Sequence, residues 1–135
     1  MSTTGTRIDR IANVIIPVAD QDAMIAWYGE KLGMPVRVDV PMDPSRAYRW
    51  VEVGVGDGET TLAICPPPPG GETGNRSTGI TLQTQNIETL YAELKAAGVD
   101  VDAEISRMGD PVPPMFWFRD PENNTLLVVE VAAQG

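Results

Sequence analysis

The stretch FWFRDPENNTLLVVEV, residues 116–131, decides the fold of this chain. An aromatic run leads into a polar turn of Asp, Pro and Asn residues, and an aliphatic run follows, which is the pattern of a β-hairpin. A fainter copy, VGVGDGETTLAIC at residues 53–65, lies in the first half of the chain. Because both halves place β-prone runs around a turn in the same order, the sequence predicts a duplicated unit.

Composition narrows the classes of function. The 135 residues suffice for a single domain, and the net charge of −9 argues against nucleic acid, which is bound through Lys and Arg. No apolar run approaches the length of a membrane span, so no membrane partner is expected. The first residues lack the apolar segment of a secretory signal, and the single cysteine, Cys65, excludes an internal disulfide. We therefore expect a cytoplasmic protein.

Histidine is absent from the whole sequence. Its absence removes the commonest general base and the commonest ligand of transition metals. Any catalysis would have to use carboxylates, Tyr48, a lysine, Cys65 or water.

Hydrophobic periodicity and capping residues predict the order βαβββ twice. The first module spans about residues 10–66, with elements over Ile11–Val18 (strand), Gln21–Leu32 (helix), and Pro35–Val40, Ala47–Val55 and Thr60–Cys65 (strands). A Pro- and Gly-rich linker over about residues 67–77 separates it from the second module, about residues 78–132. That module has elements over Thr78–Thr84 (strand), between Asn86 and Gly98 (helix), and over Val99–Ile105, Met115–Phe118 and Thr125–Val131 (strands).

Three segments carry a family resemblance: Asn13–Asp20, Trp27–Gly33 and Phe118–Asn124, the last with Asn123 where glycine is usual. Together they resemble the vicinal oxygen chelate superfamily, which includes glyoxalase I, bleomycin-resistance proteins and extradiol dioxygenases. The resemblance implies an α+β fold in which two tandem βαβββ modules form cup-shaped mixed sheets around a cavity, with helices on the outer face. It also implies a homodimer, because modules that share a cup often come from different subunits.

The resemblance places four metal-ligand positions at Asn13, Ala63, Gly79 and Leu127. His or Glu is usual there, whereas only Asn13 carries a donor atom in this chain. One neutral amide cannot hold a transition metal, so we expect no metal and no cofactor. Glu130 lies three residues past Leu127, and this odd step indicates the opposite face of the strand and a solvent-facing carboxylate. The chain therefore looks closest to the metal-free, bleomycin-resistance-like branch.

Strand alternation predicts the lining of the cavity if Asn13 faces it. The expected ligand-binding residues are small and apolar at the former metal site and aromatic on one wall: Asn13, Tyr48, Trp50, Glu52, Ala63, Cys65, Gly79, Thr81, Phe116 and Leu127. Aligning the repeats turns Phe116 and Phe118 toward the cavity and Trp117 away, although a β-bulge would reverse this. The alternatives are ordinary packing for Trp50, a solvated edge charge for Glu52 and an inert thiol for Cys65.

Three functions are compatible with this lining. The favoured hypothesis is a metal-free protein, rather than an enzyme, that sequesters or carries a small molecule. The lining favours an aromatic ligand and is also compatible with a cationic one. The alternative is a metal-dependent lyase, isomerase or dioxygenase with non-standard ligands such as Glu52, Glu130 and Asp120, or a metal-free enzyme in which burial raises the pKa of Glu52 as general base. The third is a structural domain with a filled cup.

Overall fold

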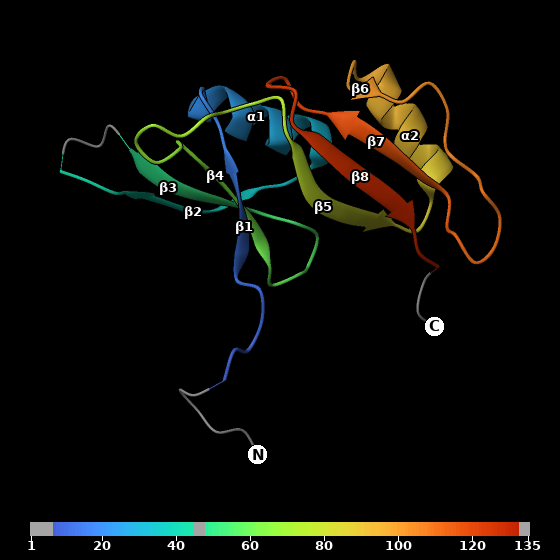
Figure 1. The fold of residues 1–135 in the computed structure, drawn as a ribbon, viewed down its shortest axis with the longest axis horizontal. Coiled ribbons are helices and arrows are strands. Elements are labelled where there is room, and N and C mark those ends of the chain that lie inside the picture. Colours follow the sequence, from blue (N-terminus) through green and yellow to red (C-terminus); the bar gives the residue numbers. More distant parts are fainter. Residues whose placement is uncertain (1–6, 45–47, 133–135) are drawn as a thin grey trace.

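The chain folds as one unit repeated twice, a strand followed by a helix and three strands (Figure 1). The computed structural model describes residues 7–44 and 48–132, so Ala47, at the start of a predicted strand, lies outside the described residues. The first unit contains β1 (Asn13–Pro17), α1 (Gln21–Leu32), β2 (Val36–Pro41), β3 (Arg49–Gly54) and β4 (Thr61–Cys65). The second contains β5 (Ser77–Thr84), α2 (Ile87–Ala96), β6 (Asp100–Val101), β7 (Met115–Arg119) and β8 (Thr125–Glu130).

Each unit forms its own four-stranded mixed sheet, with the strand orders β1-β4-β3-β2 and β5-β8-β7-β6. In both sheets the first strand pairs in parallel with the last strand of its unit, and the other pairs are antiparallel. The helix of each unit is the crossover that a parallel pair requires. The predicted α+β fold of two repeated modules is confirmed.

Local chemistry fixes the ends of both helices. Asp20 and Asn86 accept hydrogen bonds from backbone N–H groups in the first turns of α1 and α2, as expected of N-caps. Gly33 ends α1 with φ of 68°, a left-handed conformation that glycine adopts without strain. Among the described residues, no helix is long and apolar enough to cross a membrane.

The predicted strand over Val99–Ile105 is wrong in length, because β6 covers only Asp100–Val101. Beyond it, the Asp102 side chain replaces a backbone carbonyl: its Oδ2 accepts from Trp117 N at 3.0 Å. A carboxylate that takes a ladder hydrogen bond in this way ends regular pairing. After β6, pairing with β7 resumes as an isolated β-bridge between Ser106 and Met115.

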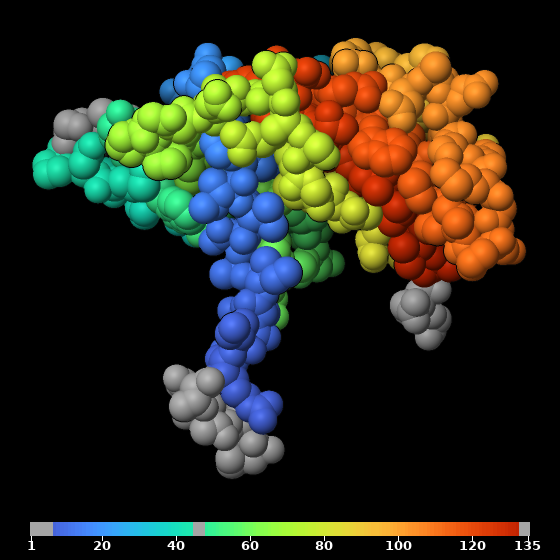
Figure 2. Space-filling model, viewed as in Figure 1, coloured from blue at the N-terminus to red at the C-terminus, as the bar shows by residue number. Residues whose placement is uncertain are grey.

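One hydrophobic core joins the two units. Its members share the helix-facing sides of both sheets and the inner sides of both helices: Ile16, Val18, Met24, Tyr28, Met34, Val53, Leu62, Ile64, Ile87, Leu94, Val99, Phe116, Phe118, Leu126 and Val128. On β1, β4 and β8 the core face is aliphatic, with residues such as Ile16, Ile64 and Leu126. The N-terminal segment, by contrast, projects from the body before β1, and Ile8 is 98% exposed (Figure 2).

The turn between β7 and β8 fastens the second sheet to α1. Tyr28 donates its hydroxyl hydrogen to Asp120 Oδ2 at 2.8 Å, deep in the core. Burial and the neighbouring Asp120 raise the pKa of Tyr28, so the hydroxyl stays a donor. Glu122, in the same turn, accepts from the backbone N–H groups of Ala19 and Asp20, at the start of α1. These contacts cross between the units, whereas most hairpin turns bond only within themselves.

Candidate functional site

The face of each sheet opposite the helices is where a ligand site was predicted. In the first sheet, strand register places Ile15 beside Ala63 and Ala63 beside Glu52, so these side chains share that face. Paired residues Val40 and Trp50 lie on it as well. We call this surface the open face of the first sheet, since α1 packs on the other side. The open face of the second sheet is likewise the side opposite α2.

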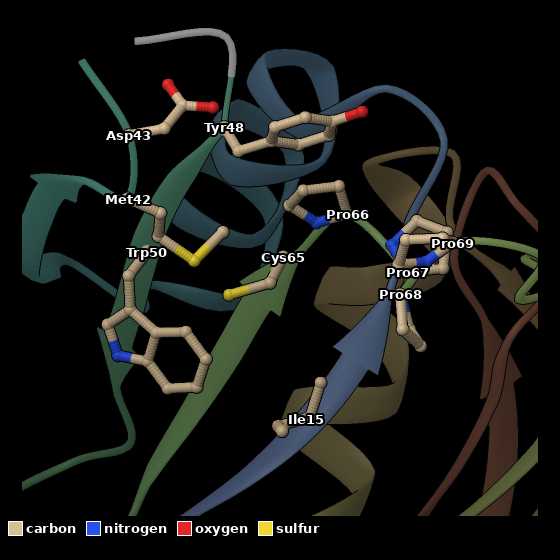
Figure 3. Close-up of a pocket in the computed structure, with 10 residues that line it drawn as sticks. All are labelled: Ile15, Met42, Asp43, Tyr48, Trp50, Cys65, Pro66, Pro67, Pro68 and Pro69. Atoms are coloured by element: carbon tan, nitrogen blue, oxygen red, sulfur yellow. The ribbon is translucent and has the colours of Figure 1, made fainter. Parts of the chain in front are cut away.

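A pocket of about 670 Å³ lies at one end of this open face. Its lining is mostly apolar and aromatic: Ile15, Met42, Asp43, Tyr48, Trp50, Cys65, Pro66, Pro67, Pro68 and Pro69. Figure 3 shows Trp50 and Met42 on one side and Pro67–Pro69 opposite them. Tyr48 lies across one end and Ile15 at the other, with Cys65 between the walls. Pockets of this volume and lining take organic ligands of drug size.

Glu52 is held beside this pocket by two neutral donors. Its Oε2 accepts from Trp50 Nε1 at 2.6 Å, and its Oε1 accepts from Thr61 Oγ1 at 2.7 Å. The hydrogen bond from Trp50, followed by that from Thr61, holds the pKa of the Glu52 carboxyl below its ordinary value. A general base at Glu52 would need a raised pKa, whereas these hydrogen bonds shift the pKa of Glu52 in the opposite direction.

Cys65 is the pocket residue with the most reactive side chain, and its surroundings keep it unreactive. The thiol is 2% exposed and donates a long hydrogen bond to Val51 O at 3.8 Å. Burial raises the pKa of the thiol, which lowers the fraction present as the nucleophilic thiolate.

The structure divides the predicted ligand residues among three places. Tyr48, Trp50 and Cys65 line the pocket. Asn13, Glu52 and Ala63 lie on the same open face outside the lining, and Ala63 is fully buried under its neighbours. The rest belong to the second sheet: Gly79 and Thr81 border a groove of about 410 Å³ between β5 and the β1–β4 region, and Leu127 pairs with Thr81.

The predicted orientation of Phe116 is wrong. Phe116 is fully buried on the helix side, where its ring meets Tyr91 edge to face at a centroid distance of 5.1 Å. Trp117 lies instead on the open face of the second sheet, where it pairs with Leu127. Its side chain is 37% exposed. The reason is the turn length: Glu52 pairs with the residue eleven positions later, Ala63, whereas Trp117 pairs with the residue ten positions later, Leu127. The connection in the second unit is one residue shorter, so Trp117 rather than Phe116 is the residue equivalent to Glu52. Each side chain of β7 therefore lies on the opposite face from the one predicted.

Sequence reasoning missed the proline wall and Met42. The sequence predicts a linker over about residues 67–77 and assigns no element to Met42, which lies between the strands predicted over Pro35–Val40 and Ala47–Val55. Four successive prolines directly after a strand do predict one property. Proline restricts the backbone, so the segment is stiff. The position of that segment over β1 depends on tertiary packing.

The donor atoms near the expected metal site do not fit a transition metal. Of the non-standard ligands considered, Glu130 accepts from Ile87 N at 3.0 Å and so caps α2, and Asp120 is committed to the β7–β8 turn. Glu130 is thus a helix-capping group, with its backbone paired to Thr84. Within residues 7–44 and 48–132, no three His, Cys, Asp or Glu side chains are grouped to hold a metal ion.

Comparison with known proteins agrees with this architecture. A crystal structure from Sphaerobacter thermophilus DSM 20745, of a glyoxalase/bleomycin resistance protein/dioxygenase superfamily member, matches with a TM-score of 0.82 and 28% identity, covering 92% of this chain and 98% of that one. TnmS3, an antibiotic binding protein from Streptomyces sp. CB03234, matches with a TM-score of 0.76 and 25% identity, covering 93% and 98%.

A relative in Bacillus subtilis (strain 168), the uncharacterized protein YetH, is 28% identical over 128 residues, which are 91% of this chain and 99% of the relative. A sequence model of one family matches residues 7–128, nearly the whole described chain. With its two βαβββ units, the chain belongs to the Glyoxalase/Bleomycin resistance protein/Dioxygenase superfamily.

Proposed function

We propose that this chain is a metal-free binding protein that sequesters or carries a small aromatic ligand in the pocket bounded by Trp50, Tyr48 and Pro66–Pro69. The observation that carries the proposal is the pocket itself, about 670 Å³ with an aromatic wall facing a proline wall. A flat ring can stack on the indole and contact the prolines, and each well-placed aromatic pair contributes about 1 kcal/mol beyond burial.

The chemistry of the nearby groups favours binding over catalysis. The Glu52 carboxyl has a lowered pKa, the Cys65 thiol has a raised pKa, and the other acids considered as ligands hold backbone N–H groups. None of these groups is poised to move a proton at neutral pH or to act as a nucleophile. The likeness to TnmS3, which is an antibiotic binding protein, supports the same proposal.

A ligand screen with metal controls tests this function. An aromatic ligand at 100 times its Kd should raise the free energy of unfolding by about 2.7 kcal/mol, measurable as a rise in Tm. Nickel, zinc and iron salts should leave Tm unchanged. Trp50→Ala should weaken the ligand at least about tenfold, and Trp50→Phe, which keeps a ring, should weaken it less. A stoichiometric, tightly held metal ion with three or more protein ligands would support the enzyme instead.

We further propose that the protein works as a homodimer. The open face of the second sheet carries Trp117 and Thr81, both exposed, and both sheets turn their other faces into the shared core. A second copy could lay Trp117 and Leu127 over the open face of the first sheet and cover two apolar surfaces at once.

Sedimentation analysis checks the dimer. The wild-type chain should sediment at twice its 14.6 kDa mass. Trp117→Glu should shift it to the monomer mass, because a carboxylate would be buried without a partner. Met108→Glu, at a side chain 71% exposed in the β6–β7 loop, serves as control and should leave the mass unchanged. A wild-type monomer at high concentration would contradict the proposal.

A further inference from the structure

We propose that the ligand of this pocket is an aromatic ammonium ion, whose ring stacks on Trp50 and whose positively charged N–H group binds Glu52. This inference rests on the proposed function, since it names the class of ligand that the same pocket selects. Two features support it: the hydrogen-bond donors and acceptors around the pocket, and the position of the Glu52 carboxylate.

The polar groups at the pocket are mostly acceptors. Two donors are already used inside the protein: Trp50 Nε1 bonds Glu52 Oε2, and Cys65 Sγ bonds Val51 O. Pro66–Pro69 have no backbone N–H to donate. Apart from the Tyr48 hydroxyl, these side chains offer a ligand nothing to accept from. A ligand that supplies donors therefore fits better than one that supplies acceptors.

Glu52 is a half-buried negative charge, and no Lys or Arg of the described residues forms an ion pair with it. Both of its hydrogen-bond partners, Trp50 and Thr61, are neutral donors. The nearby Arg49 is committed to Asp22 and Asp39. Because neutral donors leave its charge uncompensated, this carboxylate is a place where a ligand can supply a positive charge.

Trp50 links this carboxylate to the pocket. Its ring lines the pocket, and its ring nitrogen lies on the side away from the prolines, where it bonds Glu52 (Figure 3). A flat ligand stacked in the pocket could carry an ammonium group past the edge of the indole to the carboxylate. The ring of such a ligand then packs on the indole, and its ammonium group makes a charge-assisted hydrogen bond to Glu52.

Three probes of one shape and different charge test the inference. They are 1-naphthylmethylammonium, the neutral 1-naphthalenemethanol and the anionic 1-naphthoate, and their binding to the full chain is measured by calorimetry and tryptophan fluorescence. The wild type should bind the ammonium probe about tenfold more tightly than the alcohol, and the carboxylate most weakly. Glu52→Gln should bring the ammonium and alcohol affinities to within about twofold and leave the alcohol affinity unchanged.

Glu104→Gln is the matched control, because it removes the same charge from an exposed position in the second unit. It should keep the tenfold preference, which separates a local contact from attraction by the net charge of −9. Equal affinities for ammonium and alcohol in the wild type, or an unchanged preference in Glu52→Gln, would overturn the inference while leaving the aromatic pocket intact. Loss of alcohol binding in Glu52→Gln would also overturn it, because Glu52 would then only support the pocket. Failure of all three probes to bind would reject the aromatic pocket itself.

Discussion

Asp120→Ala should lower the free energy of unfolding by about 4 kcal/mol. Asp120 is 4% exposed, and its carboxylate accepts four hydrogen bonds. The donors are the Tyr28 hydroxyl, the Asn124 side chain, and the backbone N–H groups of Glu122 and Asn124. Alanine would leave these donors in the interior without an acceptor, and a buried unsatisfied donor costs about 1–3 kcal/mol.

Urea unfolding measures the loss, and two milder variants separate its causes. Asp120→Asn keeps one acceptor oxygen and should cost less than alanine. Tyr28→Phe removes only the hydroxyl that joins α1 to the turn and should cost about 1–2 kcal/mol. An Asp120→Ala protein within about 1 kcal/mol of the wild type would show that water reaches the turn and replaces the carboxylate.

Phe116→Ala should cost about 4 kcal/mol, because it empties a fully buried ring position in the core. The lost ring packs edge to face on Tyr91 and lies on the same side of β7 as Phe118, so truncation removes both apolar burial and an aromatic pair. Chemical unfolding of the variant measures this cost directly.

Phe116→Leu distinguishes the core position from a ligand-site position. Leucine keeps most of the volume and should cost less than about 1.5 kcal/mol while leaving binding of an aromatic probe unchanged. If Phe116 faced the ligand, as the repeat alignment suggested, both variants would weaken probe binding while stability hardly changed. That combination would contradict the orientation described here.

The sequence predicts those parts of the fold that depend on neighbouring residues. Asp20, Gly33 and Asn86 begin or end helices through contacts within a single turn, so their residue types suffice for the prediction. Alternation along β4 likewise separates the core face from the open face, because its large aliphatic residues, Leu62 and Ile64, occupy every second position.

Prediction fails where the answer depends on a distant part of the chain. The run Phe116-Trp117-Phe118 is aromatic on both faces, so only its pairing with β8 decides which side is buried. Asp102 ends β6 through a side-chain hydrogen bond to Trp117, which residue periodicity does not reveal. The pocket wall formed by Pro66–Pro69 likewise exists only because those residues lie opposite Trp50.

The four prolines of that wall change what binding costs in conformational entropy. Proline holds φ near about −65° and has almost no rotamer freedom, so the segment is already restricted before any ligand arrives. The freedom of the connection lies just beyond it, at Gly70 and Gly71, which do not line the pocket. A ligand that meets this wall orders little of the protein, and even a few contacts can then be retained as net affinity.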